Sequence, residues 1–277
     1  MILDRRNLLV GAGSVAALGI AGMASAARLP LIGLQLFTVR ELFQTDPVRT
    51  LEVVVRIGYR EVEFGGGGYG SMDHRMLRRT MDRLGLRAPS VHIGYDLLLR
   101  RFDSSVAMAK TLGADTVVMP YMAAEHRNEA NWQAALLNFN RFAEDLKKVG
   151  LGFAYHNHDF EFTNKHAGVS LFDRFLDQTD ASLVKVELDL YWIKHAGIEP
   201  AELIDRIGRR VYAFHIKDTG SDGRMTAIGL GTTDFGALFK RKASSGVRHF
   251  YVENDQAPTP YLPDITTSFQ TLRALRF

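Results

Sequence analysis

The stretch LVKVELDLYW, residues 183–192, decides both the fold and the chemistry of this chain. Its first half is apolar and β-branched, which predicts a buried strand. Side chains alternate between the two faces of a strand, so Glu187 and Asp189 share one face, about 6.6 Å apart. Two carboxylates on a buried face are unfavourable unless a cation lies beside them. A divalent metal and a Lys or Arg partner both meet that need, so this stretch alone leaves the two open.

The rest of the chain alternates short apolar runs with amphipathic ones. Strands are predicted at residues 31–37, 61–64, 87–93, 116–119, 152–156, 184–189, 212–216 and 249–253. Helices are predicted at about 46–57, 72–84, 103–112, 128–149, 170–178, 199–207, 234–243 and 264–275. The expected N-caps are Asp46, Ser71, Asp103 and Thr233-Asp234, and the expected C-terminal glycines are Gly58, Gly85, Gly113, Gly150 and Gly208.

Eight strands alternating with eight helices predict an α/β fold, a single-domain (β/α)8 TIM barrel over residues 27–277. The rival is an open doubly wound sheet, which would carry a GxGxxG motif after its first strand. No such motif follows the first predicted strand. The run Gly65–Gly68 lies after the second strand without that spacing, so we interpret it as a flexible loop rather than a phosphate cradle.

The first 26 residues are predicted to be a targeting segment and not part of the fold. Arg5 and Arg6 precede a Gly/Ala-rich apolar run, and Ala24-Ser25-Ala26 forms a small-residue cleavage site. The segment resembles a bacterial twin-arginine export signal, which implies an exported, periplasmic protein. An uncleaved N-terminal anchor is the alternative. The apolar run is short and Gly-rich, so we expect no stable membrane insertion.

The composition is that of an ordinary globular protein. The formal net charge of +3 falls to about +2 without the first 26 residues, and no basic stripe is present, which argues against a nucleic-acid partner. Cysteine is absent, which excludes disulfides and thiolate ligands. A homo-oligomer stays open, because the apolar stripe of the 128–149 helix should mostly face the barrel.

Polar residues collect where the predicted strands end. Parallel strands of a barrel bring their C-terminal ends to one shared site. The residues at or just after these ends are Gln35, Glu63, His92, His156, His158, Glu187, Asp189, His215, Lys217 and Glu253. Imidazole and carboxylate ligands together suit a divalent transition metal better than calcium, so a metal site is favoured over a purely structural network. We expect Mn, with Zn, Fe, Co and Mg as alternatives.

Four motifs now resemble a known family: YHNHDFEF (155–162), VELDLYW (186–192), HIKD (215–218) and VEND (252–255). Together with GLQLFTVR near residue 33, they are similar to the sugar phosphate isomerase/epimerase proteins of the xylose isomerase-like TIM barrels. The resemblance covers residues 30–277 and implies one divalent ion held by residues of the last four strands. Carried over, three ligands are Asp189, His215 and Glu253, and His156 becomes the fourth.

Two positions depart from the family pattern. Many members carry Glu, followed two residues later by His, where this chain has His156 and His158. An imidazole can bind the metal but cannot supply the same anionic base, so the family's two-glutamate mechanism does not transfer directly. Trp192 stands where several sugar epimerases carry a substrate-binding His. Trp192 is either a sugar-stacking platform or a packing residue.

The resemblance implies a metal-dependent isomerase or epimerase that acts on a carbohydrate carbonyl compound through an enediolate. Glu253 is the expected base, with His156, His158 or Glu187 as the second acid or base and Lys217 beside the developing oxyanion. Gln35, Glu63, His92 and Trp192 are the expected substrate-binding residues. The same site would also suit a 3-keto-glycoside lyase acting by β-elimination. A non-catalytic sugar-binding barrel is the alternative of another class.

Overall fold

The computed structural model describes residues 27–241 and 246–277. The predicted export signal, residues 1–26, lies outside the described residues and stays a prediction. The two ends of the described chain meet, because the backbone N–H of Ala27 donates to the carbonyl of Phe277 at 2.7 Å. None of the helices within the described ranges is long and apolar enough to cross a membrane.

Eight parallel strands close into a barrel, which confirms the predicted (β/α)8 fold. The strands are β1 (Gly33–Gln35), β2 (Glu61–Phe64), β3 (Arg87–His92), β4 (Thr116–Met119), β5 (Gly152–His156), β8 (Val184–Asp189), β9 (Val211–Ile216) and β12 (His249–Val252). Their order around the barrel is β1-β12-β9-β8-β5-β4-β3-β2, and β1 pairs with β2 to close the ring. Every predicted strand is present, although β1 is shorter than expected because a 3-10 turn, η1 (Leu36–Val39), begins directly after Gln35.

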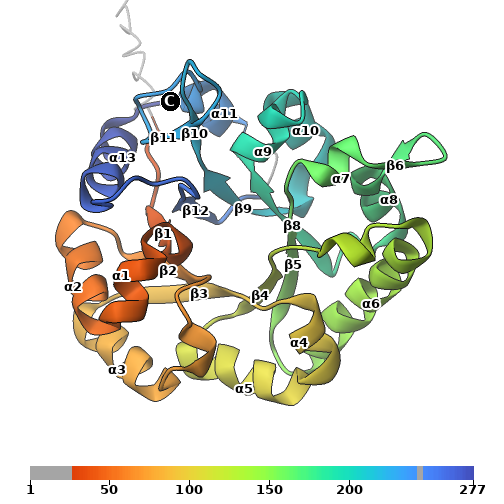
Figure 1. The fold of residues 1–277 in the computed structure, drawn as a ribbon, viewed down its shortest axis with the longest axis horizontal. Coiled ribbons are helices and arrows are strands. Elements are labelled where there is room, and N and C mark those ends of the chain that lie inside the picture. The colour runs from red at the N-terminus through yellow and green to blue at the C-terminus, as the bar shows by residue number, and fades with distance from the viewer. Residues whose placement is uncertain (1–26, 242–245) are drawn as a thin grey trace, which may run out of the picture.

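Helices form a ring around the strands (Figure 1). The predicted helices appear as α2 (Pro47–Ile57), α3 (His74–Leu84), α5 (Phe102–Leu112), α6 (Glu129–Lys148), α8 (Leu171–Gln178), α10 (Pro200–Ile207), α11 (Phe235–Lys240) and α13 (Leu262–Ala274). Short helices that the sequence did not predict lie in the loops after the strands: α1 (Arg40–Thr45), α4 (Tyr95–Arg100), α7 (Phe160–Thr163) and α9 (Leu190–His195). The hairpins β6/β7 (Lys165–His166, Val169–Ser170) and β10/β11 (Asp218–Thr219, Met225–Thr226) also lie in such loops.

The helix ends show which cap predictions hold. Asp46 caps α2 by accepting a hydrogen bond from the Arg49 N–H, and Asp234 caps α11 in the same way. The predictions for Ser71 and Asp103 are wrong. Ser71 belongs to a 3-10 turn, and the carboxylate of Asp73 caps α3 instead. Helix α5 begins at Phe102, and Arg101 is its N-cap residue. Asp103 is therefore the second residue of the helix and not its cap.

The core lies between the strands and the helices. Phe139 of α6 is fully buried, and its ring lies 5.3 Å from Tyr155 of β5 and 5.9 Å from Phe153. The inside of the barrel differs, because buried polar side chains fill its upper part. Such groups are stable only when they are hydrogen-bonded or paired, so this interior needs a network of partners.

Candidate active site

A pocket of about 520 Å³ opens at the C-terminal end of the barrel. Its lining comes from the ends of β2, β3, β4, β5, β9 and β12, as expected for the active-site end of a TIM barrel. The lining residues are Phe37, Gly65, Gly66, His92, Pro120, Tyr121, His156, His158, Lys217, Glu253 and Asp255. This volume is within the range of small-molecule sites.

Three imidazoles surround one carboxylate oxygen beneath this pocket. Glu187 Oε2 lies 3.0 Å from His92 Nε2, 3.2 Å from His156 Nδ1 and 3.0 Å from His215 Nε2. The other oxygen, Oε1, is buried without a hydrogen-bond partner within the described structure. Burial raises the pKa of Glu187, but His215 and the hydrogen bonds from the imidazoles outweigh this and hold it well below its usual range.

Glu63 is the second carboxylate that reaches this cluster. Its Oε2 lies 2.8 Å from His215 Nε2 and accepts a hydrogen bond from Gln35 Nε2 at 2.8 Å. On its other side, Oε1 accepts a hydrogen bond from Ser90, whose hydroxyl lies 2.9 Å from that of Tyr251. Glu63 is therefore fixed at both oxygens, by partners from the strands β1, β9 and β3.

The Lys217 ammonium is surrounded by three carboxylates. Its Nζ lies 2.8 Å from Asp189 Oδ2, 2.7 Å from Glu253 Oε2 and 2.8 Å from Asp255 Oδ2. Burial lowers the pKa of Lys217, but the carboxylates outweigh burial and raise it well above its usual range. Lys217 is therefore a fixed positive charge at neutral pH.

The imidazoles differ in charge. Burial lowers the pKa of His92, yet Glu63 and Glu187 outweigh it and raise the value to about 9. Burial and then His215 lower the pKa of His156, whereas burial and then His156 hold that of His158 well below its usual range. His92 is thus protonated at neutral pH, and His158 is neutral.

The residues present fit a divalent metal. His156, Asp189, His215 and Glu253 offer ligand atoms that all lie within 4.8 Å of one another, and all four side chains are buried. His92, His156, Glu187 and His215 form a second group of this kind. The two imidazole nitrogens and two carboxylate oxygens of the first group are a donor set typical of Mn, Zn, Fe or Co. In the second group, the unpartnered Oε1 of Glu187 is a buried oxygen that a cation could take up.

The structure brings the predicted site residues together, but in two layers. His92, His156, His158, Lys217 and Glu253 line the pocket. Gln35, Glu63, Glu187, Asp189 and His215 are fully buried below it. Trp192 lies behind the lining, with its ring 5.6 Å from that of His158 and 6.0 Å from Lys217 Nζ. The roles of all these residues stay predictions.

Sequence reasoning missed several pocket residues. Asp255 follows Glu253 by two residues, and that spacing could have placed it on the same side. Tyr121 is half exposed, and its ring packs edge-on against His158 at 5.1 Å. Gly65 and Gly66 also line the pocket. A Cβ at Gly65 would lie 2.6 Å from Gln35 Oε1, and Gly66 adopts a φ of +69°, so both positions suit glycine, whereas Gly68 has open space around it. The flexibility expected of this loop stays a prediction.

Comparison with known proteins agrees with this architecture. The sequence model of the xylose isomerase-like TIM barrel matches residues 51–264. The chain belongs to this family. It is 22% identical over 234 residues to an inosose dehydratase of Geobacillus kaustophilus (strain HTA426), covering 70% of this chain and 74% of that protein.

Two solved structures share the fold of this xylose isomerase-like barrel. A sugar phosphate isomerase/epimerase from Parabacteroides distasonis ATCC 8503 superposes with a TM-score of 0.75 at 24% identity, covering 94% of this chain and 98% of that one. The probable 3-DHS dehydratase of Bacillus anthracis, involved in petrobactin synthesis, superposes with a TM-score of 0.66 at 11% identity, covering 87% and 98%. The resemblance found in the sequence motifs is confirmed at the level of the family.

Proposed function

We propose that this barrel is a metal-dependent lyase that removes the proton next to the carbonyl of a keto-sugar and then eliminates the β-substituent. The observation that carries the proposal is the placement of the acid and base groups. Both pocket-lining carboxylates, Glu253 and Asp255, come from the end of β12. The imidazoles of His92 and His156 come from β3 and β5, each three strands away around the barrel.

This placement suits elimination. Proton exchange between two faces of a sugar carbon needs a basic group on each face, whereas elimination needs a base on one side and a proton donor for the leaving oxygen. Glu253 is the base, because it lines the pocket and is ionised: burial raises its pKa, but Lys217 and His215 outweigh burial and hold the pKa well below its usual range. His92 carries a proton at neutral pH and lines the pocket, so it is the donor.

In the proposed reaction, Glu253 accepts the α-proton and the C–H electron pair forms the enolate. As the ketone re-forms, the C–O bond at the β-carbon breaks and the departing oxygen takes a proton from His92. A divalent ion held by His156, Asp189, His215 and Glu253 would supply Lewis-acid polarisation of the carbonyl. Lys217 holds the Glu253 carboxylate in place at 2.7 Å. His158 is neutral, and its Nδ1 has no partner within the described structure, so it can accept a hydrogen bond from a sugar hydroxyl.

Two relatives support elimination by their names, because the Geobacillus and Bacillus proteins are both dehydratases. The second candidate is isomerase or epimerase chemistry from the same enolate. The similarity to the Parabacteroides isomerase/epimerase favours it, with His158 as the second base. We further propose that the ion is manganese and that the protein is exported to the periplasm, as its N-terminal motif indicates.

The test is proton NMR in D2O on the manganese-loaded protein, with a 3-keto-glucoside and a free ketohexose in parallel. Release of the aglycone supports the lyase. Deuterium next to the carbonyl of an intact sugar, with a new isomer, supports the isomerase or epimerase instead. Metal binding without turnover of either sugar favours a sugar-binding barrel. Glu253→Gln should lower turnover about 10³-fold, whereas Tyr121→Phe, which keeps the aromatic wall, should leave it nearly unchanged.

A further inference from the structure

A second cavity, of about 550 Å³, lies at the opposite, N-terminal end of the barrel. Its lining includes Thr116 and Gly152, the first residues of β4 and β5, and Val211, the first of β9. We call it the basal cavity. The pocket described above is lined instead by residues at the other ends of these strands, so the two cavities share no residue.

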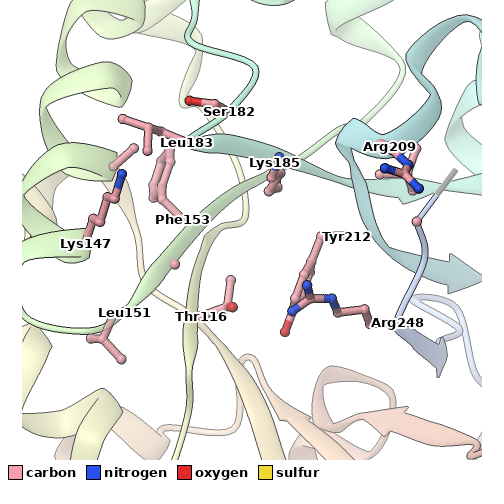
Figure 2. A pocket seen from close by; sticks show the side chains of 14 residues that line it. Thr116, Lys147, Leu151, Phe153, Ser182, Leu183, Lys185, Arg209, Tyr212 and Arg248 are labelled. Atoms are coloured by element: carbon pink, nitrogen blue, oxygen red, sulfur yellow. The ribbon is translucent and has the colours of Figure 1, made fainter.

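Among the residues that the structure describes, four cationic side chains line the basal cavity, and no Asp or Glu does. They are Lys147 at the end of α6, Lys185 of β8, Arg209 of the 3-10 turn η4 (Gly208–Arg210) and Arg248 just before β12. Figure 2 shows them around the cavity, with Lys147 on the left, Lys185 in the middle and the two arginines on the right. The cations come from four separate elements, so the fold, and not one basic run, gathers them.

The positive charge of the basal cavity is incompletely balanced. Asp115 and Asp180 lie near the cavity without lining it: Asp115 accepts a hydrogen bond from the Thr116 hydroxyl, Asp180 accepts one from the Ser182 backbone, and the Asp180 carboxylate offsets part of the charge around Lys185. Burial, followed by Arg210 and Arg248, lowers the pKa of Lys185, which shows that like charges crowd this ammonium. An anion placed here would relieve that repulsion.

The Tyr212 hydroxyl is the second sign of a ligand. Tyr212 is only 7% exposed and lines the cavity, and among the described residues its hydroxyl has the Thr116 side chain beside it but makes no hydrogen bond of normal geometry. A buried hydroxyl without a well-formed hydrogen bond is destabilising, so such groups are rare unless something else completes them. The Tyr212 hydroxyl and the Arg248 guanidinium lie in the same lower right part of the cavity (Figure 2).

The opposite side of the cavity is apolar. Leu151, Phe153 and Leu183 line the side that carries Lys147, away from Arg209 and Arg248 (Figure 2). A free oxyanion would fill only a small part of the volume and would not use this wall. A molecule with one anionic end and one less polar end would contact both sides.

We propose that the basal cavity binds a small organic phosphate. The phosphate group lies between Arg209, Arg248 and Lys185 and accepts a hydrogen bond from the Tyr212 hydroxyl. Guanidinium groups match phosphate oxygens with two parallel donors, which makes them suited to this end of the ligand. The organic part lies against Leu151, Phe153 and Leu183. This site is independent of the proposed lyase reaction.

Isothermal titration calorimetry on the full-length protein tests the proposal with three probes: phenyl phosphate, inorganic phosphate and phenol. We expect phenyl phosphate to bind most tightly, inorganic phosphate more weakly and phenol not at this cavity. Arg209→Gln and Arg248→Gln should each weaken phenyl phosphate binding about 10-fold, the loss of one charge-assisted hydrogen bond. Lys148→Gln is the matched control, because Lys148 is the exposed neighbour of Lys147, pairs with Asp145 and does not line the cavity.

Tyr212→Phe gives a test that does not depend on the charges. It should weaken phenyl phosphate binding several-fold while leaving the melting temperature of the free protein unchanged or raised, because it removes a buried hydroxyl that makes no hydrogen bond of normal geometry. No binding of either phosphate, or equal binding by the arginine variants and Lys148→Gln, would overturn the site. Equal affinity for inorganic phosphate and phenyl phosphate would overturn the role of the apolar wall.

Discussion

The Lys217 ammonium lies 2.8 Å from the Asp189 carboxylate, and both groups are buried at the end of the barrel where the candidate metal ligands meet. The sequence left open whether a metal or a cationic side chain balances the two carboxylates of β8. The structure gives these two carboxylates different partners. Lys217 pairs with Asp189, whereas Glu187 lies among imidazoles that offer metal-ligand nitrogens.

Replacing Lys217 by Met should make the protein more dependent on a metal. Without the ammonium, Asp189, Glu253 and Asp255 lose their shared cation, so the metal-free variant should be destabilised by about 3–5 kcal/mol. Manganese should then raise the melting temperature more in the variant than in the unaltered protein. Thermal unfolding with and without chelator measures this. If manganese raised the melting temperature equally in both proteins, Lys217 and the ion would not share these carboxylates.

Two carboxylate variants should identify the ligand group that holds the metal. If the ion binds to His156, Asp189, His215 and Glu253, then Asp189→Asn should abolish manganese retention. Glu187→Gln should lower the affinity only about 10–100-fold, because Glu187 would then orient the imidazoles without binding the ion. Metal content after dialysis, measured by mass spectrometry, distinguishes the two. If Glu187→Gln loses the metal and Asp189→Asn only weakens its binding, the ion is held by His92, His156, Glu187 and His215.

Glu161 should make stability depend on pH. Burial raises its pKa to about 8 from 4.5, against hydrogen bonds from Tyr155 and from the backbone. The folded protein therefore binds more protons than the unfolded chain between these values. This stabilisation is complete below pH 4.5 and is lost as the pH rises through about 8. The free energy of unfolding should fall by up to about 1.4 kcal/mol per pH unit in that window.

Glu161→Gln tests this dependence, because the amide keeps polar contacts but does not titrate. Urea unfolding at several pH values should show that the stability of Glu161→Gln relative to the unaltered protein rises steadily from pH 5 to 8, because only the unaltered protein loses this stabilisation. Parallel stability curves would contradict the raised pKa.

Helix α6 offers a matched pair of core and surface positions. Phe139 is fully buried against Tyr155, whereas Leu137, two residues earlier, is 64% exposed. Phe139→Ala should therefore destabilise the protein by about 3–5 kcal/mol, and Leu137→Ala should change its stability by less than about 0.5 kcal/mol. Thermal or urea unfolding measures both. Similar losses at both positions would mean that Leu137 is covered in solution, as in a homo-oligomer.

The sequence by itself determined the eight barrel strands and the eight helices that alternate with them, but not the short helices in the loops after the strands. The strand of Glu187 and Asp189 was readable because Val184, Val186 and Leu188 recur at every second residue, and glycines such as Gly58 and Gly85 marked helix ends. Strand ends also predicted which polar residues would meet, since a closed parallel barrel brings these ends together. The sequence did not predict that Asp73 and Arg101 are the N-cap residues of α3 and α5, because neighbouring cap candidates differ only in backbone geometry.

Only the tertiary structure decided how the site residues are divided between layers and which partners they have. Glu63 and Gln35 lie beneath the pocket and His92 lines it, although each follows a similar apolar run in sequence. The partners of Lys217 come from two strands, and those of Glu187 from three others. Depth in the barrel and distances between strands depend on register and closure, which local patterns do not encode. The basal cavity also depends on the tertiary structure. The four cationic residues that line it in the described chain are far apart in the sequence and come together only when the ring of strands closes.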